Sequence, residues 1–214
     1  MSKIYSFLGD FYHSHDYVFS AVKKAVDMLD GGVTLVDSNL QDISSILDKN
    51  PSAIIFATEN RVNPESEDAH EWLTKELDEK ITSYVKNGGN FIAIHAALAS
   101  YPKDSKYVDM LKGYFIDHPQ EHYNVRYTTN NKSPLNGSFD FTALDEHYVL
   151  HVDEANTNVF MKLSSDFGEG CAGWFHEYGK GRVIAIAPTH NKEGFEMDEV
   201  VRLYCEVIGW SLAK

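Results

Sequence analysis

The chain has 214 residues, of which 43% are hydrophobic and 24% charged, a composition typical of a folded globular protein. Its 19 basic and 32 acidic side chains give a formal net charge of −13, and an acidic surface repels phosphate backbones and anionic lipids, so neither nucleic acid nor a membrane is expected as a partner. The chain has only two cysteines, no signal-peptide core, and no apolar run of the ~20 residues that cross a bilayer, so we expect a reducing, cytoplasmic location.

The first half of the chain alternates short apolar runs with helical patterns, which is the rhythm of β-α-β units and a parallel sheet. The run 53–57 (AIIFA) is apolar at every position, as a parallel strand buried on both faces should be. Apolar residues recur four apart between Leu73 and Val85 and predict one long helix over 67–87. The predicted strands of this half are 4–8, 33–36, 53–57 and 91–95, and the predicted helices are 18–29, 43–47 and 67–87.

The second half contains shorter apolar runs joined by turns. The segment 178–182 (YGKGR) is typical of a tight turn between two strands. Helical spacing returns between Met197 and Ile208 and predicts a final helix that packs on the sheet. The composition is even and contains no linker, so we expect a single α/β domain over residues 1–214. The predicted strands of this half are 123–128, 149–152, 159–163, 171–178 and 182–187.

Five short segments stand out: 88–97 (GGNFIAIHAA), 113–119 (GYFIDHP), 145–148 (DEHY), 174–183 (WFHEYGKGRV) and 189–190 (TH). In content and order they resemble the motifs of the ThuA-like (trehalose utilisation) family. The resemblance covers about residues 85–210, and the earlier part matches only as alternating strand and helix. It implies a class I glutamine amidotransferase-like fold, that is, a flavodoxin-type three-layer α/β sandwich with a mainly parallel central sheet. It also implies a function in disaccharide or keto-sugar utilisation, with a small sugar or keto-sugar as the partner.

His95 stands where the strand 91–95 meets the small residues Ala96 and Ala97, a pattern typical of a sharp elbow. An elbow pushes its residue out above the carboxyl end of the strand, where open α/β sheets bind ligands. Glutaminases of the implied fold carry a nucleophilic cysteine there, and neither Cys171 nor Cys205 can replace it, so we expect no cysteine-dependent glutaminase activity. A helix starting at the elbow would keep His95 neutral through its dipole, free to accept a proton or bind a metal. The alternative is that His95 only plugs the turn through hydrogen bonds.

His190 and Glu146 complete the candidate catalytic residues. His190 follows an apolar strand, where amidotransferases place the histidine of their triad, but Lys192 stands where the acid would be, so the triad logic fails. Glu146 is a candidate general acid or base, because a partly buried site can raise the pKa of a carboxyl towards neutrality. The alternative is a loop in which Asp145 only caps backbone donors.

Further histidines and aromatic residues supply the candidate binding residues. His13 or His15 follows the first strand and is expected at the same sheet edge as His95, whereas Trp174 either stacks on a sugar or fills the core. Imidazole suits Zn, Ni or Fe(II), so a divalent metal such as zinc is the candidate cofactor. The candidate substrate contacts are His118, Trp174, His15 and Tyr148, and the candidate metal ligands are His95, His190 and His13.

Three kinds of function stay open. The first is a sugar-active isomerase, lyase or hydrolase, with or without a metal, in which a base, an acid and a group that polarises oxygen act together. Two carboxylates placed for ordinary glycoside hydrolysis are not evident. The second is a non-catalytic binding or regulatory module, and the third is a docking partner of a sugar dehydrogenase. Homo-oligomerisation also stays open.

Overall fold

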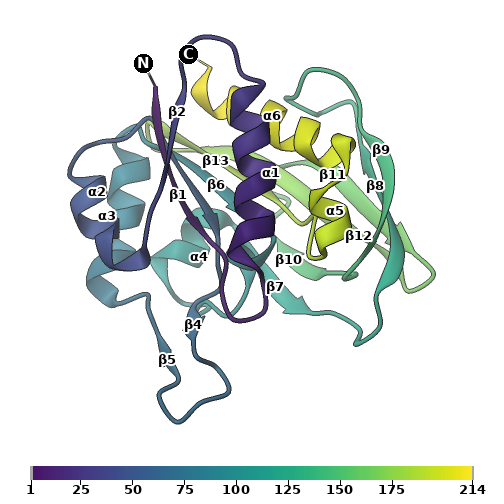
Figure 1. The fold of residues 1–214 in the computed structure, drawn as a ribbon, viewed down its shortest axis with the longest axis horizontal. Coiled ribbons are helices and arrows are strands. Elements are labelled where there is room, and N and C mark those ends of the chain that lie inside the picture. Colours follow the sequence, from purple (N-terminus) through teal and green to yellow (C-terminus); the bar gives the residue numbers. More distant parts are fainter. Residues whose placement is uncertain (1, 214) are drawn as a thin grey trace.

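The computed structural model describes residues 2–213, and a nine-stranded mixed sheet forms its centre (Figure 1). The strand order is β2-β1-β3-β6-β13-β12-β11-β8-β9. The pairs from β2 to β13 are parallel and those from β13 to β9 are antiparallel. The strands are β1 (Lys3–Leu8), β2 (Thr34–Asp37), β3 (Ala53–Ala57), β6 (Asn90–Ile94), β8 (Tyr123–Thr129), β9 (Asp140–Asp145), β11 (Asn158–Ser165), β12 (Gly168–Tyr178) and β13 (Gly181–Ile186).

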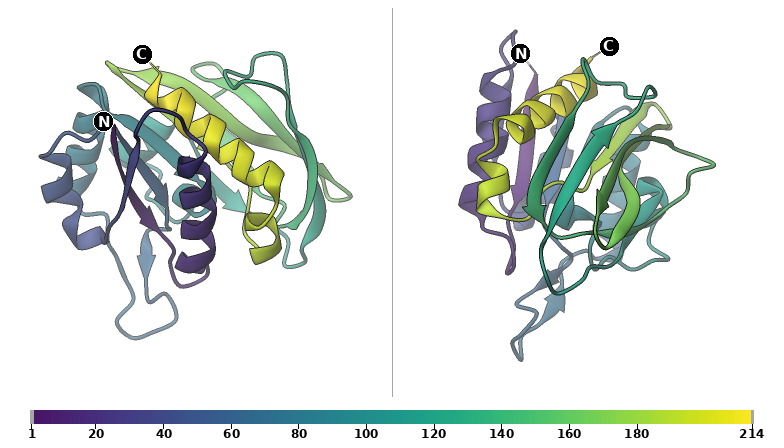
Figure 2. Two further views of the ribbon diagram at one scale, coloured as in Figure 1. Left: turned by 45° about the horizontal axis from the view of Figure 1, so that its top comes forward. Right: turned by 90° about the vertical axis from the view of Figure 1, so that its right-hand side faces the viewer.

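Helices cover both faces of the parallel half of the sheet. On one face α1 (His15–Asp27) and α6 (Asp198–Leu212) lie side by side, as Figure 2 shows, and pack on one apolar cluster. On the other face lie α2 (Ile43–Leu47), α3 (Lys75–Lys86) and α4 (Lys106–Leu111). Strand β3 contributes to both apolar clusters, because successive side chains of a strand point to opposite faces of the sheet. Ile55 packs in the cluster under α1 and α6, while its neighbours Ile54 and Phe56 pack in the cluster on the other face.

The expectation of a mainly parallel sheet describes only the first five strands in spatial order. The second half of the chain extends the sheet through antiparallel pairs, which join without crossover helices. Two small sheets lie beside it: β7 (Gly113–Asp117) pairs with β10 (Val149–Val152), and β4 (Arg61–Val62) pairs with β5 (His70–Glu71) in a hairpin that projects from the body (Figure 1). The sequence patterns did not predict the strands β4, β5, β7 and β9. None of the described helices has the length and apolarity to cross a bilayer.

The long helix predicted over 67–87 is wrong at its start. Helix α3 begins only at Lys75, because Thr74 is extended and its side chain accepts a hydrogen bond from the backbone N–H of Leu77. The residues before it form β5 and a loop, in which the indole N–H of Trp72 donates to the carbonyl of Glu59 (2.8 Å). The apolar spacing that suggested a longer helix therefore belongs partly to a packed loop.

Candidate functional site

His95 lies at the elbow that its sequence predicts. Strand β6 ends at Ile94, and His95 opens the short 3-10 turn η2 (His95–Leu98) with φ of +45°, a left-handed conformation that a residue other than glycine rarely adopts. Only 2% of His95 is exposed, and Ala96 and Ala97 beside it are buried. The turn holds the imidazole at the carboxyl end of the parallel strands, where this kind of sheet binds ligands.

The two ring nitrogens of His95 have different partners. Nδ1 lies 2.6 Å from the carbonyl oxygen of Ala187, which can only accept, so Nδ1 carries the hydrogen. Nε2 therefore faces Glu146, whose Oε2 lies 3.2 Å away. Tyr148 stacks on the ring with the centroids 4.1 Å apart.

The predicted cause of a neutral His95, a helix dipole, is wrong. Burial alone would lower the pKa of His95, but the hydrogen bond to Glu146 and the negative charges of Asp145 and Glu146 raise it above its ordinary value. The predicted dipole is missing, because η2 is a four-residue 3-10 turn and not an α-helix. The prediction of a raised pKa for Glu146 is also wrong: burial would raise it, but the hydrogen bond and charge of His95 hold it at about 2.

His13 reaches the same point from the loop after β1. Its Nδ1 lies 2.6 Å from Oδ1 of Asp10, a buried carboxylate that also accepts from the backbone N–H groups of Tyr12 and His13. His13 is buried, and within residues 2–213 its Nε2 has no hydrogen-bond partner. Asp10 thus fixes the ring and leaves Nε2 free to face His95 and His190. The ring centroid of His13 lies 5.1 Å from that of His95 and 4.8 Å from that of His190.

His190 follows β13, and its backbone N–H donates to Oδ1 of Asp145 (2.8 Å). Its Nδ1 lies 3.4 Å from Oε2 of Glu146. Burial lowers the pKa of His190 to about 3, and the neighbouring charge of His95 acts in the same direction. His190 is therefore held as a neutral imidazole beside the carboxylate.

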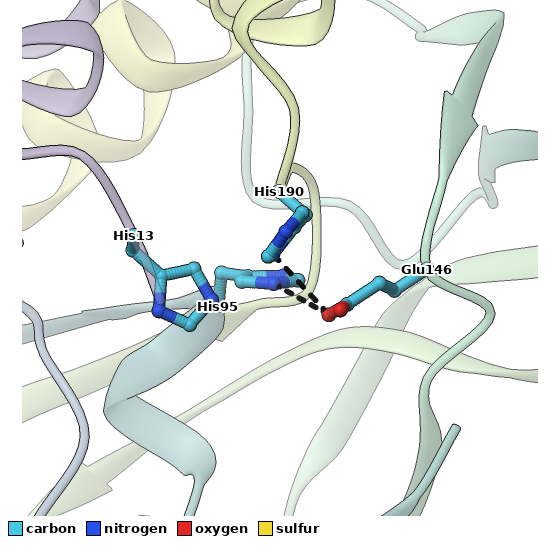
Figure 3. Close-up of side chains that lie close together, drawn as sticks. All are labelled: His13, His95, Glu146 and His190. Carbon is cyan, nitrogen blue, oxygen red and sulfur yellow. Dashed lines mark hydrogen bonds and ion pairs between the residues drawn. The ribbon is translucent and has the colours of Figure 1, made fainter. Parts of the chain in front are cut away.

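Together these residues form what we call the histidine cluster. One ligand atom from each residue lies within 4.8 Å of the others, and Figure 3 shows the side chains converging from four separate segments. Imidazole nitrogens and a carboxylate oxygen are ligands that Zn and Fe(II) accept. The members of the cluster are His13, His95, Glu146 and His190.

A cavity of about 420 Å³ opens beside the cluster. His118 lines it with one third of its side chain exposed, and its Nε2 lies 3.5 Å from Oε1 of Glu146. Tyr148 lines it as well. The full lining is Tyr12, His13, Glu59, Arg61, Ala99, Ser100, Phe115, His118, Glu146, Tyr148 and His190.

Two predicted contacts lie elsewhere. Trp174 is fully buried, and its indole N–H donates to the carbonyl of Leu111 (2.7 Å), so the prediction of a sugar-stacking platform is wrong. Its face of β12 is covered by α4 and the β7–β10 sheet, which leaves no room for a ligand. His15 is exposed and its Nε2 lies 2.9 Å from Oδ2 of Asp37, so of the two early histidines only His13 reaches the cavity.

Sequence reasoning missed three carboxylates. Asp10 follows β1 and Gly9 at the carboxyl end of the parallel strands, the edge expected to bind a ligand, so its position was a usable signal. Asp145 was considered only as a cap, and it does accept from the N–H groups of Glu146 (2.9 Å) and His190 (2.8 Å), which places both of these residues. Glu59 belongs to no pattern, because it enters the cavity through the path of a loop.

Comparisons with known proteins agree with this architecture. The family model ThuA, described as trehalose utilisation, matches residues 12–211. A ThuA-like protein from Parabacteroides merdae ATCC 43184 superposes with a TM-score of 0.72 at 14% identity, over 99% of this chain and 90% of that one. A ThuA-like protein from Bacteroides uniformis ATCC 8492 gives 0.70 at 20% identity, over 100% and 92%.

A cold-adapted β-galactosidase from Rahnella sp. R3 is also similar. It gives a TM-score of 0.64 at 14% identity, over 100% of this chain and 32% of the enzyme. At these identities the structural likenesses show the fold alone. No curated protein sequence matches the chain.

Proposed function

The chain belongs to the ThuA (trehalose utilisation) family, and from this premise we propose that it acts on a sugar or keto-sugar in the cavity beside the histidine cluster, with the help of a divalent metal ion. The observation that carries the proposal is the convergence of three imidazoles and one carboxylate on one point at the wall of a 420 Å³ cavity. A cavity of this size is typical of sites for small molecules.

The arrangement of ring hydrogens supports a metal ion. Asp10 and the carbonyl of Ala187 each take the Nδ1 hydrogen of a cluster histidine, which leaves Nε2 of His13 and of His95 as lone-pair donors. Nε2 of His95 then faces a carboxylate oxygen of Glu146. The nitrogen and the oxygen would each direct a lone pair at the other, so a cation is needed between them. A proton on His95 fills that need in the metal-free protein, and a bound Zn²⁺ would take its place. When bound, the ion would polarise a carbonyl or hydroxyl oxygen of the sugar.

His118 is the candidate proton carrier. It is not a member of the cluster, it is partly exposed at the cavity, and Oε1 of Glu146 lies 3.5 Å from its Nε2. An imidazole there can take a proton from the carbon next to a sugar carbonyl. In one outcome that proton returns to the former carbonyl carbon while the hydroxyl proton of the first carbon moves to the former carbonyl oxygen. In the other, a carbon–carbon double bond forms as the glycosidic oxygen on the next carbon leaves and takes the proton. These two outcomes are an isomerisation and an elimination, and we place the reaction in one of these classes.

The same reasoning extends to the fold. We assign the parallel half to the flavodoxin type, since the order β2-β1-β3-β6-β13 corresponds to 2-1-3-4-5, and we treat residues 1–214 as one class I glutamine amidotransferase-like domain. A glutaminase mechanism has no support, because His95 occupies the elbow, Cys171 lies on β12 and Cys205 lies on α6. Burial raises the pKa of the Cys171 thiol to about 12, which also argues against a nucleophilic role.

The experiment compares metal-free and zinc-loaded protein, purified without a histidine tag, in a thermal-shift screen. The panel holds trehalose and other disaccharides together with 3-keto-sugars, and product is followed by NMR. A ligand at 100 times its dissociation constant adds about 2.7 kcal/mol of stability. We expect sugar-dependent stabilisation and turnover only with zinc. Stabilisation by a sugar without turnover would indicate a binding or regulatory module instead of an enzyme. If no sugar stabilised either the metal-free or the zinc-loaded protein, the proposal would be contradicted and a docking partner favoured.

A further inference from the structure

A second polar group lines the same cavity, away from the histidine cluster. It consists of Glu59, which follows β3, Arg61, which opens β4, and Ser100, which follows η2. Glu59 is only 2% exposed, so its carboxylate is removed from bulk water. We call these three residues the Glu59 group.

The two oxygens of Glu59 are used unequally. Oε2 accepts from Nε of Arg61 (3.0 Å), from Nη2 of Arg61 (2.8 Å) and from the hydroxyl of Ser100 (2.7 Å). Oε1 is buried and has no hydrogen-bond partner within residues 2–213. A buried carboxylate oxygen without a donor is costly, and such atoms are rare in folded proteins. The free Oε1 therefore indicates that a ligand entering the cavity supplies the missing hydrogen-bond donor.

The backbone beside Glu59 is also unusual. Ser100 has φ of +67°, and His95, five positions earlier, has φ of +45°. Left-handed residues other than glycine are strained and concentrate at ligand sites. The segment from His95 to Ser100 thus presents one strained residue to the histidine cluster and one to the Glu59 group.

Asp10 joins the two groups. Its Oδ1 holds Nδ1 of His13, and its Oδ2 accepts from the backbone N–H of Glu59 (2.9 Å). The free oxygen of Glu59 and the free nitrogen of His13 are therefore fixed relative to each other by one buried carboxylate. A ligand that spans the cavity can meet the oxygen of Glu59 at one end and a metal ion held by the nitrogen of His13 at the other.

The charges of the Glu59 group select the kind of ligand. The carboxylate repels an anion, and the guanidinium beside it repels a cation. A neutral ligand with both donors and acceptors fits, since Nη1 of Arg61 makes no hydrogen bond in the described part of the chain and nearly half of that side chain is exposed. Neighbouring hydroxyls have this character, because each can donate and accept.

We propose that Glu59, Arg61 and Ser100 form a subsite for a vicinal diol of the sugar. One hydroxyl donates to Oε1 of Glu59, and its neighbour accepts from Nη1 of Arg61, while Ser100 holds the carboxylate in place. The subsite deepens and rests on the proposed sugar function. It gives the cavity two ends: the histidine cluster holds the reacting carbon, and the Glu59 group recognises intact hydroxyls further along the sugar.

The test measures trehalose binding to zinc-loaded protein by calorimetry, together with zinc content. Glu59→Gln keeps the size of the side chain and removes its charge, and Arg61→Met keeps the stem and removes the donors. The matched control is Asp140→Asn, which weakens the exposed ion pair between Asp140 and Arg126, two residues that do not line the cavity. We expect each cavity variant to bind trehalose at least about tenfold more weakly, the loss of one charge-assisted hydrogen bond, with unchanged zinc content.

Equal trehalose affinity in wild type, Glu59→Gln and Arg61→Met would overturn the subsite and leave the proposed sugar function standing. Zinc-loaded wild type that binds neither trehalose nor a 3-keto-sugar would overturn both. Inorganic phosphate serves as a second probe: if phosphate binds and Arg61→Met abolishes that binding, the group is an anion site and the diol assignment is wrong. Arg61 is half-exposed, so Arg61→Met keeps the test valid even if Glu59→Gln fails to fold.

Discussion

Nε2 of His95 lies 3.2 Å from Oε2 of Glu146, while Nδ1 of the same ring is committed to the carbonyl of Ala187. A neutral imidazole in this setting would place two lone pairs against each other, so the pair needs a positive charge between its atoms. The free Nε2 of His13 and the neutral ring of His190 complete a set of donors around that point. We therefore propose that the elbow and its neighbours hold a cation at this point.

Asp10→Asn should weaken zinc binding without unfolding the protein. Asp10 takes the Nδ1 hydrogen of His13, and loss of a carboxylate behind a metal-binding histidine typically costs 10–100-fold in metal affinity. A competition titration with a chelating dye measures this, with Asp16→Asn as the control, since Asp16 is almost fully exposed and its only ion pair within residues 2–213 is with His15. Equal zinc affinity in wild type and Asp10→Asn would show that Asp10 does not position a ligand.

The thiol of Cys171 should be inert at neutral pH. Burial raises its pKa to about 12, so its thiolate fraction at pH 7.5 is roughly a thousandfold lower than at the ordinary value of 9.0. We expect slow labelling by iodoacetamide in the folded protein, a rate that rises with pH, and rapid labelling in urea. Cys171→Ala should leave any sugar-dependent stabilisation unchanged. Fast labelling of the folded protein at pH 7.5, or loss of the sugar effect, would reopen a nucleophilic role.

Gly181→Ala should destabilise the protein strongly. A methyl group at Gly181 would overlap the carbonyl oxygens of Gly89 and Val85, where β13 passes close to the end of α3. Overpacking of this kind costs about 1–3 kcal/mol or more. Gly170→Ala is the control, because its methyl group would meet only ordinary contacts. Thermal unfolding of both variants checks the prediction, and equal melting temperatures would refute the close approach.

Trp174→Phe should lower stability but leave sugar binding intact. The variant loses the hydrogen bond to Leu111 and part of a fully buried ring, a change worth about 1–3 kcal/mol. Gly113 packs against the same ring, since a methyl group there would overlap it, so the two motif residues serve the core. Chemical denaturation measures the first effect and calorimetry the second. A selective loss of sugar affinity would restore the stacking interpretation.

The sequence predicts the sheet edge and part of the site for physical reasons that can be named. Apolar runs mark β1, β6 and β13, and parallel strands bring their carboxyl ends together. The residues that follow these strands, His13, His95 and His190, are therefore expected at one edge. The side from which a strand residue is covered is not encoded locally, and Trp174 was therefore open to two interpretations.

The charges of the site could not be derived from local sequence. The pKa direction of His95 depends on Asp145 and Glu146, about fifty positions away, which approach only when β9 joins the sheet. Glu59 reaches the cavity because the chain passes from β3 to β4 at this point, and no periodicity in the sequence indicates its position. The sequence therefore identified histidine and carboxylate residues as candidates, whereas the charged residues that surround each of them are set by the tertiary structure.

The most direct test is the zinc stoichiometry of untagged protein after equilibrium dialysis, measured by mass spectrometry of the metal. We expect one Zn²⁺ per wild-type chain, and binding weakened by more than about 100-fold in His95→Ala and in His13→Ala, because each removes a ligand rather than its support. His15→Ala should match wild type, since His15 faces Asp37 and lies outside the cluster. Wild-type protein without zinc, or equal zinc content in His95→Ala, would contradict the account.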